Sequence, residues 1–204
     1  MLELLEIENK LHENGYNSIC CIDEVGRGCL FGDVVACAIV MPKNLILEGV
    51  KDSKKLSEKK RESLYDVILK NSIAYGIGRV NAKTIDNINI KQSTRIAMKL
   101  AVENLKDKLG NTIIPDYLLI DAEKIDLNIP QDGIIKGDDR CHGIACASII
   151  AKVYRDRMCL EWDKIFPEYN LKKHKGYGTK EHRDAIKEFG PSPEHRLTFL
   201  KNIL

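Results

Sequence analysis

Short apolar runs rich in valine and isoleucine alternate with polar stretches along the first two thirds of the chain. Such runs are typical of β-strands when turn residues bound them. Gly26, Gly28 and Gly32 lie between the first two runs. The pattern predicts strands at 18–24, 34–41, 72–80 and 116–121, and 133–137 is a candidate for a short fifth strand.

Apolar residues spaced three or four positions apart predict helices in the remaining segments. Ser57 is a predicted N-cap for a helix over 57–70, and Thr179 is one for a helix that ends at Phe189, before Gly190. Further helices are predicted at 1–17, 91–109, 143–162 and 194–203.

Strands that come first and then alternate with helices predict an α/β or α+β layered fold. The length of 204 residues suits one domain, and 44% hydrophobic with 30% charged residues is ordinary for a folded chain. We expect an N-terminal helix over 1–17, a main domain over 18–165, and a helical C-terminal part over 166–204 packed on the same domain.

Acidic residues stand where several predicted strands end. Asp23 and Glu24 close the first strand, Asp121 closes the fourth, and Asp138 follows the possible fifth. Clustered carboxylates repel one another, and a divalent cation such as Mg²⁺ or Mn²⁺ is the usual remedy. The alternative is that each acid is a turn residue or a helix cap. For any single acid taken alone, this alternative is the favoured interpretation.

The glycine-rich turn after the first strand invites comparison with a dinucleotide-binding loop. Its spacing, Gly26, Gly28 and Gly32, is not G-x-G-x-x-G, and a strand follows where that fingerprint must open a helix. We therefore expect the turn to bring the backbone close to a ligand.

Charge and cysteine content narrow the picture further. The net charge is only +2, but basic clusters occur at 51–61 and 172–178. Each cluster could bind nucleic acid, or it could be an ordinary solvent-exposed face of the protein. No apolar run reaches the roughly 20 residues that span a bilayer. The seven cysteines are expected to be small core residues in a reducing, cytoplasmic compartment. The sequence contains no C-x-x-C pair, so structural zinc is not expected.

Seven motifs in order resemble bacterial ribonuclease HII, the type 2 ribonuclease H, from about Ile19 to Phe199. They read IDEVGRG, DSKKLS, LLIDA, IIKGD, ASIIAKVYRDR, HKGYGTKEH and GPSPEHR. The related ribonuclease HIII carries threonine where this chain has Arg27, so the HII family is the better match.

The resemblance implies a ribonuclease H-like five-stranded mixed sheet flanked by helices. It implies hydrolysis of RNA in RNA/DNA hybrids and incision 5′ to ribonucleotides embedded in duplex DNA, with Mn²⁺ or Mg²⁺ as cofactor. The residues it points to are the metal-binding carboxylates Asp23, Glu24 and Asp121, the fourth acid Asp138, the 2′-hydroxyl-reading loop Gly26, Arg27 and Gly28, and Tyr177, which stacks on the next sugar.

Lysines of the two basic clusters are expected to hold the nucleic-acid backbone, namely Lys172, Lys173, Lys175 and some of Lys51, Lys54 and Lys55. The stretch DDRCHG departs from the family pattern, and Arg140 is its candidate phosphate contact. We expect a monomer that binds nucleic acid and no membrane. Two rivals are a non-catalytic hybrid-binding module and another metal nuclease of this fold, such as a resolvase or an exonuclease.

Overall fold

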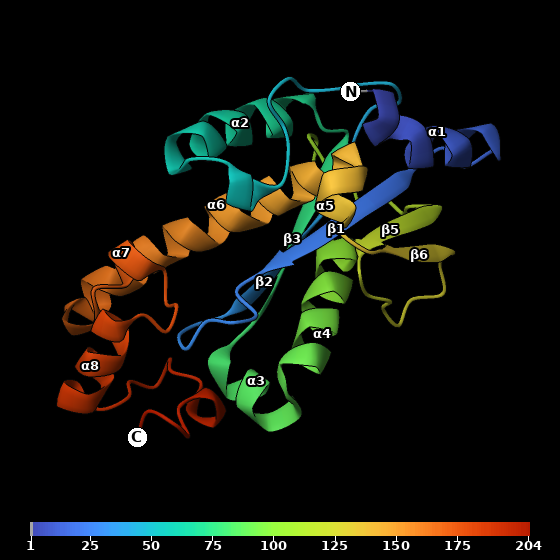
Figure 1. Ribbon diagram of the computed structural model, residues 1–204. Helices are drawn as coiled ribbons and strands as arrows, with labels where there is room; N and C mark the ends of the chain where they lie inside the picture. Colours follow the sequence, from blue (N-terminus) through green and yellow to red (C-terminus); the bar gives the residue numbers. More distant parts are fainter. Residues whose placement is uncertain (1) are drawn as a thin grey trace.

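Six strands form one mixed sheet in the computed structural model, which describes residues 2–204 (Figure 1). The order across the sheet is β4-β3-β2-β1-β5-β6. Strand β1 pairs antiparallel with β2 and parallel with β5, so the α/β fold class is confirmed. The bounds are β1 Ile19–Val25, β2 Val34–Val40, β3 Ala74–Val80, β4 Lys106–Asp107, β5 Tyr117–Asp121 and β6 Gln131–Ile134.

The expected count of five strands is wrong by one short edge strand. The sequence predicted a helix as far as Leu109, but helix α4 (Ile90–Glu103) ends earlier, and β4 then pairs with the start of β3. The apolar spacing continued through Leu109, which is 86% exposed. Asp107 instead accepts the N–H groups of Leu109 and Asn111 and forms a turn there.

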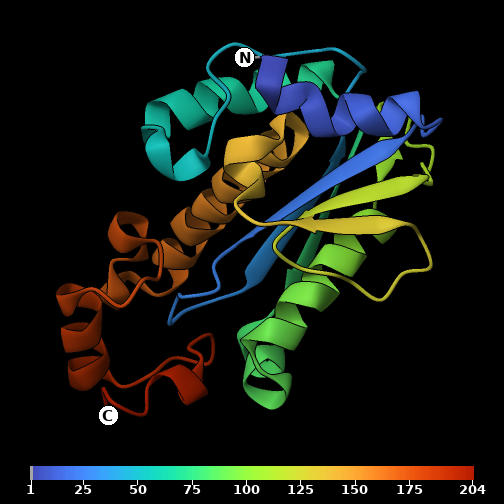
Figure 2. The same cartoon turned by 45° about the vertical axis from the view of Figure 1, so that its right-hand side comes forward.

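Helices cover both faces of the sheet (Figures 1 and 2). One face carries α1 (Glu6–Glu13), which follows the 3-10 helix η1 (Leu2–Leu5), together with α2 (Glu58–Asn71) and α6 (His142–Ile165). The other face carries α3 (Ala82–Ile88) and α4. The predicted N-cap at Ser57 is confirmed, since its hydroxyl accepts the N–H of Lys60 at 3.3 Å. No helix between residues 2 and 204 combines the length with the apolar character that a bilayer crossing requires.

The alternation of side chains along β1 divides the core into two halves. Cys21 belongs to the half under α6, whereas Cys20 and Ile22 belong to the half under α4. Helix α4 lies very close to β3, because a Cβ built on Gly78 would lie 1.9 Å from the carbonyl oxygen of Ala97. The sheet that holds the predicted acids is therefore enclosed on both faces.

The C-terminal residues wrap around the end of α6 and the loop between β1 and β2. Phe31 of that loop packs edge-on against the rings of Trp162 and Phe166. The N-cap at Thr179 is confirmed. The helix predicted over 194–203 is reduced to a 3-10 turn, at the start of which the Asp86 carboxylate accepts the N–H groups of residues 197 and 198. The elements are η3 (Pro167–Tyr169), α7 (Leu171–His174), α8 (Lys180–Phe189) and η4 (Leu197–Phe199).

Candidate active site

Three of the predicted acids meet at one edge of the sheet. Asp23 and Glu24 lie near the end of β1, and Asp121 ends the neighbouring parallel strand β5. One carboxylate oxygen from each lies within 4.8 Å of the others. Strand β1 runs one residue beyond the predicted end at position 24, to Val25, so Glu24 is the last residue but one of the strand.

Burial and mutual repulsion make this cluster unfavourable for negative charge alone. The pKa of Asp23 is raised well above its ordinary value by burial first, and then by the charges of Glu24 and Asp121. Burial also raises the pKa of Glu24, against the opposing effect of the Arg27 guanidinium. Within the part of the chain that the structure describes, the buried Oε2 atom of Glu24 has no hydrogen-bond partner. The cluster therefore has oxygen atoms free to bind a cation.

Asp138 lies beside this cluster, on the short helix α5 (Gly137–Arg140). The backbone N–H of Gly137 donates to Asp121 Oδ1 at 2.7 Å, which connects α5 to the cluster. Burial raises the pKa of Asp138, with smaller contributions from Asp52 and Asp121. The ammonium of Lys54 lies 3.7 Å from Asp138 Oδ2. Asp138 is therefore a neighbour of the three acids, but it is not one of the group whose carboxylate oxygens lie within 4.8 Å of one another.

A cleft of about 250 Å³ opens beside Glu24. It brings together residues from β1, the following loop, η2 (Ser53–Lys55), α6 and the segment after α7. Predicted residues in its lining are Glu24, Gly26, Arg27, Gly28, Lys54 and Tyr177. Sequence reasoning missed Ser53, Ser148 and Lys152. The last two lie four residues apart on α6, inside the ASIIAK motif, where this spacing places them on one helix face.

The two glycines of the G-R-G turn have different roles. Gly26 has φ +94°, and a Cβ there would lie 2.4 Å from Nε of Arg155. A Cβ on Gly28 would meet no atom within 4 Å. Gly26 is therefore required by the packing of the loop, whereas Gly28 leaves open space at the cleft. Arg27, whose side chain is 43% exposed, extends to within 3.5 Å of Glu24 Oε1.

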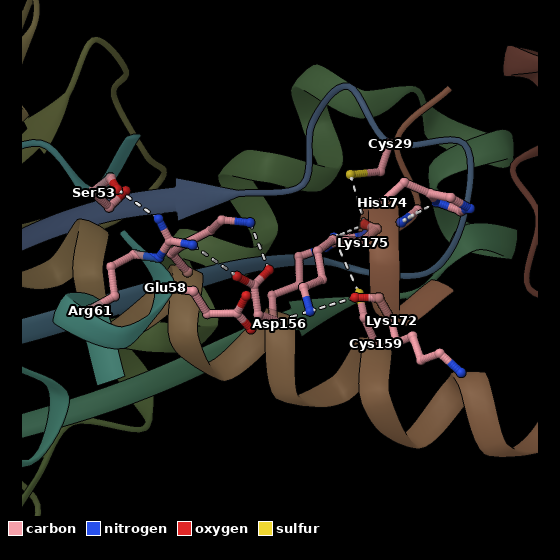
Figure 3. A network of polar contacts seen from close by, with 12 residues as sticks. Cys29, Ser53, Glu58, Arg61, Asp156, Cys159, Lys172, His174 and Lys175 are labelled. Carbon is pink, nitrogen blue, oxygen red and sulfur yellow. Dashed lines mark hydrogen bonds and ion pairs between the residues drawn. The ribbon is translucent and has the colours of Figure 1, made fainter. Parts of the chain in front are cut away.

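The buried Arg155 on α6 fixes the loop from one side. Its guanidinium donates to the carbonyl oxygens of Phe31 and Asp33 at 2.8 and 2.9 Å. It also donates at 2.8 Å to the carbonyl oxygen of Lys175, near which Figure 3 shows Cys29. One side chain therefore joins the G-R-G loop to the segment that carries Tyr177.

A second buried arginine, Arg196, holds the loop from the C-terminal part. It donates to the carbonyl oxygens of Gly26 at 2.7 Å, Gly32 at 2.8 Å and Arg27 at 3.1 Å. Neither this arginine nor Arg155 was singled out from the sequence, because nothing in a basic residue's local context shows that distant carbonyls will surround it. Both lie in quoted motifs, ASIIAKVYRDR and GPSPEHR.

A chain of hydrogen bonds between buried histidines supports Tyr177. The Nδ1–H of His182 donates to the carbonyl oxygen of Tyr177 at 3.0 Å. The Nε2 atoms of His182 and His195 lie 3.1 Å apart, and Nδ1 of His195 accepts the N–H of Ser192 at 2.9 Å. These bonds require both imidazoles to be neutral, with His195 donating to His182. Burial lowers the pKa of each to about 4.

We expect this histidine chain to make the protein less stable at acid pH. Burial lowers the pKa of His142 to about 4 as well, below the unfolded value of about 6.5. The unfolded chain therefore binds more protons between those values, and stability falls as pH drops from about 6.5 to 4. Each histidine contributes up to about 1.4 kcal/mol per pH unit.

Urea unfolding at pH 7, 6 and 5 measures this dependence. The double variant His182→Gln/His195→Gln should have a shallower slope than the wild type, because two of the four histidines with a lowered pKa are gone. The difference between the two proteins removes the contributions of all other groups. Equal slopes would mean that these imidazoles have the same pKa in the folded protein as in the unfolded chain.

The lysines of the second basic cluster lie outside the cleft lining. Lys173 pairs with Glu181 at 2.6 Å, and Lys175 Nζ lies 3.4 Å from Glu58 Oε1 (Figure 3). Arg140 donates to the carbonyl oxygen of Ile135 at 3.5 Å. The other predicted lysines are exposed, namely Lys51, Lys55 and Lys172.

Comparisons with known proteins agree with this arrangement. The family described as Ribonuclease HII matches residues 20–202. The chain is 59% identical to a ribonuclease HII of Alkaliphilus oremlandii over 200 residues, which cover 98% of each protein.

Solved structures share the fold. The ribonuclease H2 of Pyrococcus horikoshii superposes with a TM-score of 0.74 at 23% identity, over 92% of this chain and 97% of that one. Bst-RNase HIII in complex with Mn²⁺ superposes with a TM-score of 0.63 at 18% identity, over 88% and 65%. At these identities the likeness concerns the fold, whereas the family match rests on nearly the whole sequence. The chain therefore belongs to the ribonuclease HII family.

Proposed function

We propose that Asp23, Glu24 and Asp121 hold one or two divalent cations, Mn²⁺ or Mg²⁺. Their oxygen atoms lie within 4.8 Å of one another, and Glu24 has a buried oxygen without a partner among residues 2–204. Such hard oxygen donors suit these cations. The related Bst-RNase HIII has been solved with Mn²⁺. When bound, the cation supplies an activated water and neutralises charge on the phosphate.

The reaction is hydrolysis of a phosphodiester next to a ribonucleotide. Ribonuclease HII enzymes cleave RNA in RNA/DNA hybrids and at ribonucleotides embedded in duplex DNA. We expect cleavage 5′ to the ribonucleotide, leaving 5′-phosphate and 3′-hydroxyl ends. The observation that carries this proposal is the acid cluster at the edge of a cleft whose other wall is the G-R-G loop.

The residues of this chain act by positioning the junction. The open face of Gly28 allows its backbone to approach a ribose, and Arg27 stands beside Glu24. A 2′-hydroxyl can donate and accept a hydrogen bond, which is what distinguishes RNA from DNA at one sugar. Tyr177 lines the same cleft, and we propose that its ring stacks on the next deoxyribose. Asp138 adds a fourth acid beside the cluster.

Cationic side chains around the cleft hold the phosphate backbone. Lys54 is exposed and lines the cleft, and Lys152 lines it from α6. Lys173 and Lys175 lie further along the C-terminal part, and we propose that they contact the duplex outside the cleft. Such contacts set register and orientation without reading sequence.

A direct test uses a duplex that carries one ribonucleotide. We expect incision only with Mg²⁺ or Mn²⁺, and the product size should place the cut on the 5′ side of the ribonucleotide. Cleavage of a four-way junction or of a free DNA end would favour the resolvase or exonuclease alternative. Binding without any incision would favour a non-catalytic module.

Loss of the Tyr177 ring should impair junction incision more than hybrid cleavage. A stacking contact contributes about 1–3 kcal/mol, so we expect Tyr177→Ala to slow incision at a single ribonucleotide about ten- to a hundredfold. A long RNA/DNA hybrid should be affected much less, because many of its sugars can occupy the site. Parallel rates at fixed metal and salt measure the difference.

Two variants serve as controls for this prediction. Tyr177→Phe keeps the ring and should retain the junction preference. Tyr75→Ala removes a tyrosine of similar exposure, 40% against 41%, on β3 outside the cleft lining, and should change neither rate. An equal loss on both substrates in Tyr177→Ala would mean that Tyr177 supports general binding or local folding.

We further propose that the protein acts as a monomer in the cytoplasm. All seven cysteines are free and buried, which suits a reducing compartment. Size-exclusion chromatography with light scattering tests the oligomeric state, and a mass near twice 23.1 kDa would contradict it.

A further inference from the structure

A second cluster of metal-ligating side chains lies inside the protein, under the N-terminal helix. Sγ of Cys21 lies 3.8 Å from Sγ of Cys141 and 3.8 Å from Oε1 of Glu8. The three ligand atoms all lie within 4.8 Å of one another. Glu8, Cys21 and Cys141 are 7%, 2% and 0% exposed. The cluster joins α1, β1 and the N-cap position of α6.

Glu8 is the unusual member of this cluster. No lysine or arginine pairs with its carboxylate among residues 2–204, and its buried Oε2 atom has no hydrogen-bond partner there. Its other oxygen accepts the backbone N–H of Gly143 at 3.1 Å. Buried polar atoms are nearly always satisfied, so a free carboxylate oxygen beside two thiols calls for a ligand.

The spacing of the three atoms matches a tetrahedral ion. Two sulfurs bound to one tetrahedral Zn²⁺ lie about 3.8 Å apart, because each Zn–S bond measures about 2.3 Å. Gly143 makes this approach possible, because a Cβ there would lie 2.3 Å from Sγ of Cys21 and 2.8 Å from Oε1 of Glu8. A narrow surface pocket between α1 and residues 41–45 includes Glu8 in its lining.

We infer that Glu8, Cys21 and Cys141 form a site for one thiophilic divalent cation of the Zn²⁺ type, separate from the acid cluster. Two thiolates and one carboxylate select such an ion over Mg²⁺, whereas the all-oxygen cluster has the opposite preference. Binding releases the two thiol protons to solvent as the sulfurs become thiolates. The bound ion links three elements of the fold, so its role is structural, contrary to the expectation drawn from the lack of a C-x-x-C pair.

Titration of the reduced, full-length protein with Co²⁺ tests this inference. Thiolate ligands give Co²⁺ an intense sulfur-to-metal charge-transfer absorption, and the all-oxygen site cannot produce it. We expect this absorption to saturate at one equivalent and to persist in excess Mg²⁺. It should also persist in Asp121→Asn, which alters only the acid cluster.

Adjacent cysteines of β1 provide a matched pair of variants. Cys21→Ala should abolish the absorption, whereas Cys20→Ala, whose side chain lies on the opposite face of the sheet, should keep it. Glu8→Gln should weaken Co²⁺ affinity at least tenfold. Circular dichroism checks that each variant is folded.

Two results would overturn the site. One is the lack of charge-transfer absorption in the wild type, a result that needs no variant to fold. The other is undiminished absorption in folded Cys21→Ala. Neither result bears on ribonuclease activity, which is measured separately with the junction duplex.

Discussion

Asp23→Asn or Asp121→Asn is expected to lower the rate of junction incision by about a thousandfold or more in Mg²⁺, about 4 kcal/mol of transition-state stabilisation. Each change removes one negative charge from a cluster whose oxygen atoms lie within 4.8 Å of one another. The remaining acids would hold the cation more weakly and in a different position. Single-turnover cleavage of a duplex with one ribonucleotide measures the loss.

Substrate binding should survive these substitutions or become tighter, because a negative charge near the phosphate has gone. Asp132→Asn is the matched control, because Asp132 is an exposed acid of β6 that lies outside the acid cluster. Its carboxylate accepts a hydrogen bond from the hydroxyl of Tyr117. The metal-free Asp121→Asn protein should also melt at a higher temperature, because repulsion within the buried cluster is relieved. Near-wild-type turnover in either cluster variant would show that the metal site is elsewhere.

Arg196→Ala is expected to have the second largest effect. The side chain donates to three backbone carbonyls of the loop between β1 and β2. Truncation leaves the buried carbonyl of Gly32 without this donor, and that of Gly26 with only the 3.4 Å bond from the N–H of Cys29. Each unsatisfied buried group costs about 1–3 kcal/mol, so we expect the free energy of unfolding to fall by about 3 kcal/mol or more. Denaturant unfolding at neutral pH measures this change.

Catalysis should suffer beyond the loss of stability, because the loop that faces the ribose is no longer held. We expect junction incision by the folded fraction to fall at least tenfold. Arg196→Lys should not restore it, because one ammonium cannot reproduce the planar fork that reaches separate carbonyls. Arg183→Ala, an exposed arginine of α8, is the control. Full activity in folded Arg196→Ala would mean that the loop keeps its shape without this side chain.

Much of the candidate active site could be predicted from the sequence, because the positions of its acids depend on local sequence patterns. An acid that follows a buried strand is recognisable from the hydrophobic pattern, and β1 and β5 then bring Asp23 and Asp121 together. Caps at Ser57 and Thr179 are also local, and both were correct.

The features that the sequence did not predict depend on contacts between segments that are distant along the chain. Arg155 and Arg196 are basic residues with nothing nearby to mark them as buried, and the carbonyls of the β1–β2 loop to which they donate lie more than 100 positions away. The basic cluster around Lys173 and Lys175 could be recognised in the sequence, but composition does not show which face of the protein it occupies. In the structure, both lysines form ion pairs with glutamates. The short strand β4 depends on pairing with β3, which no local pattern records.

The position of Arg196 in the chain gives the protein a particular order of maturation during its synthesis. All four acids are translated by residue 138, whereas Arg196 follows 58 residues later (196 − 138). A growing chain with Arg196 still inside the ribosome can assemble β1, β5 and their carboxylates, but the carbonyls of Gly26 and Gly32 still lack their donor. The acids proposed to bind metal are thus complete before the loop proposed to read the junction is held in place, so we expect a nascent polypeptide to lack junction recognition.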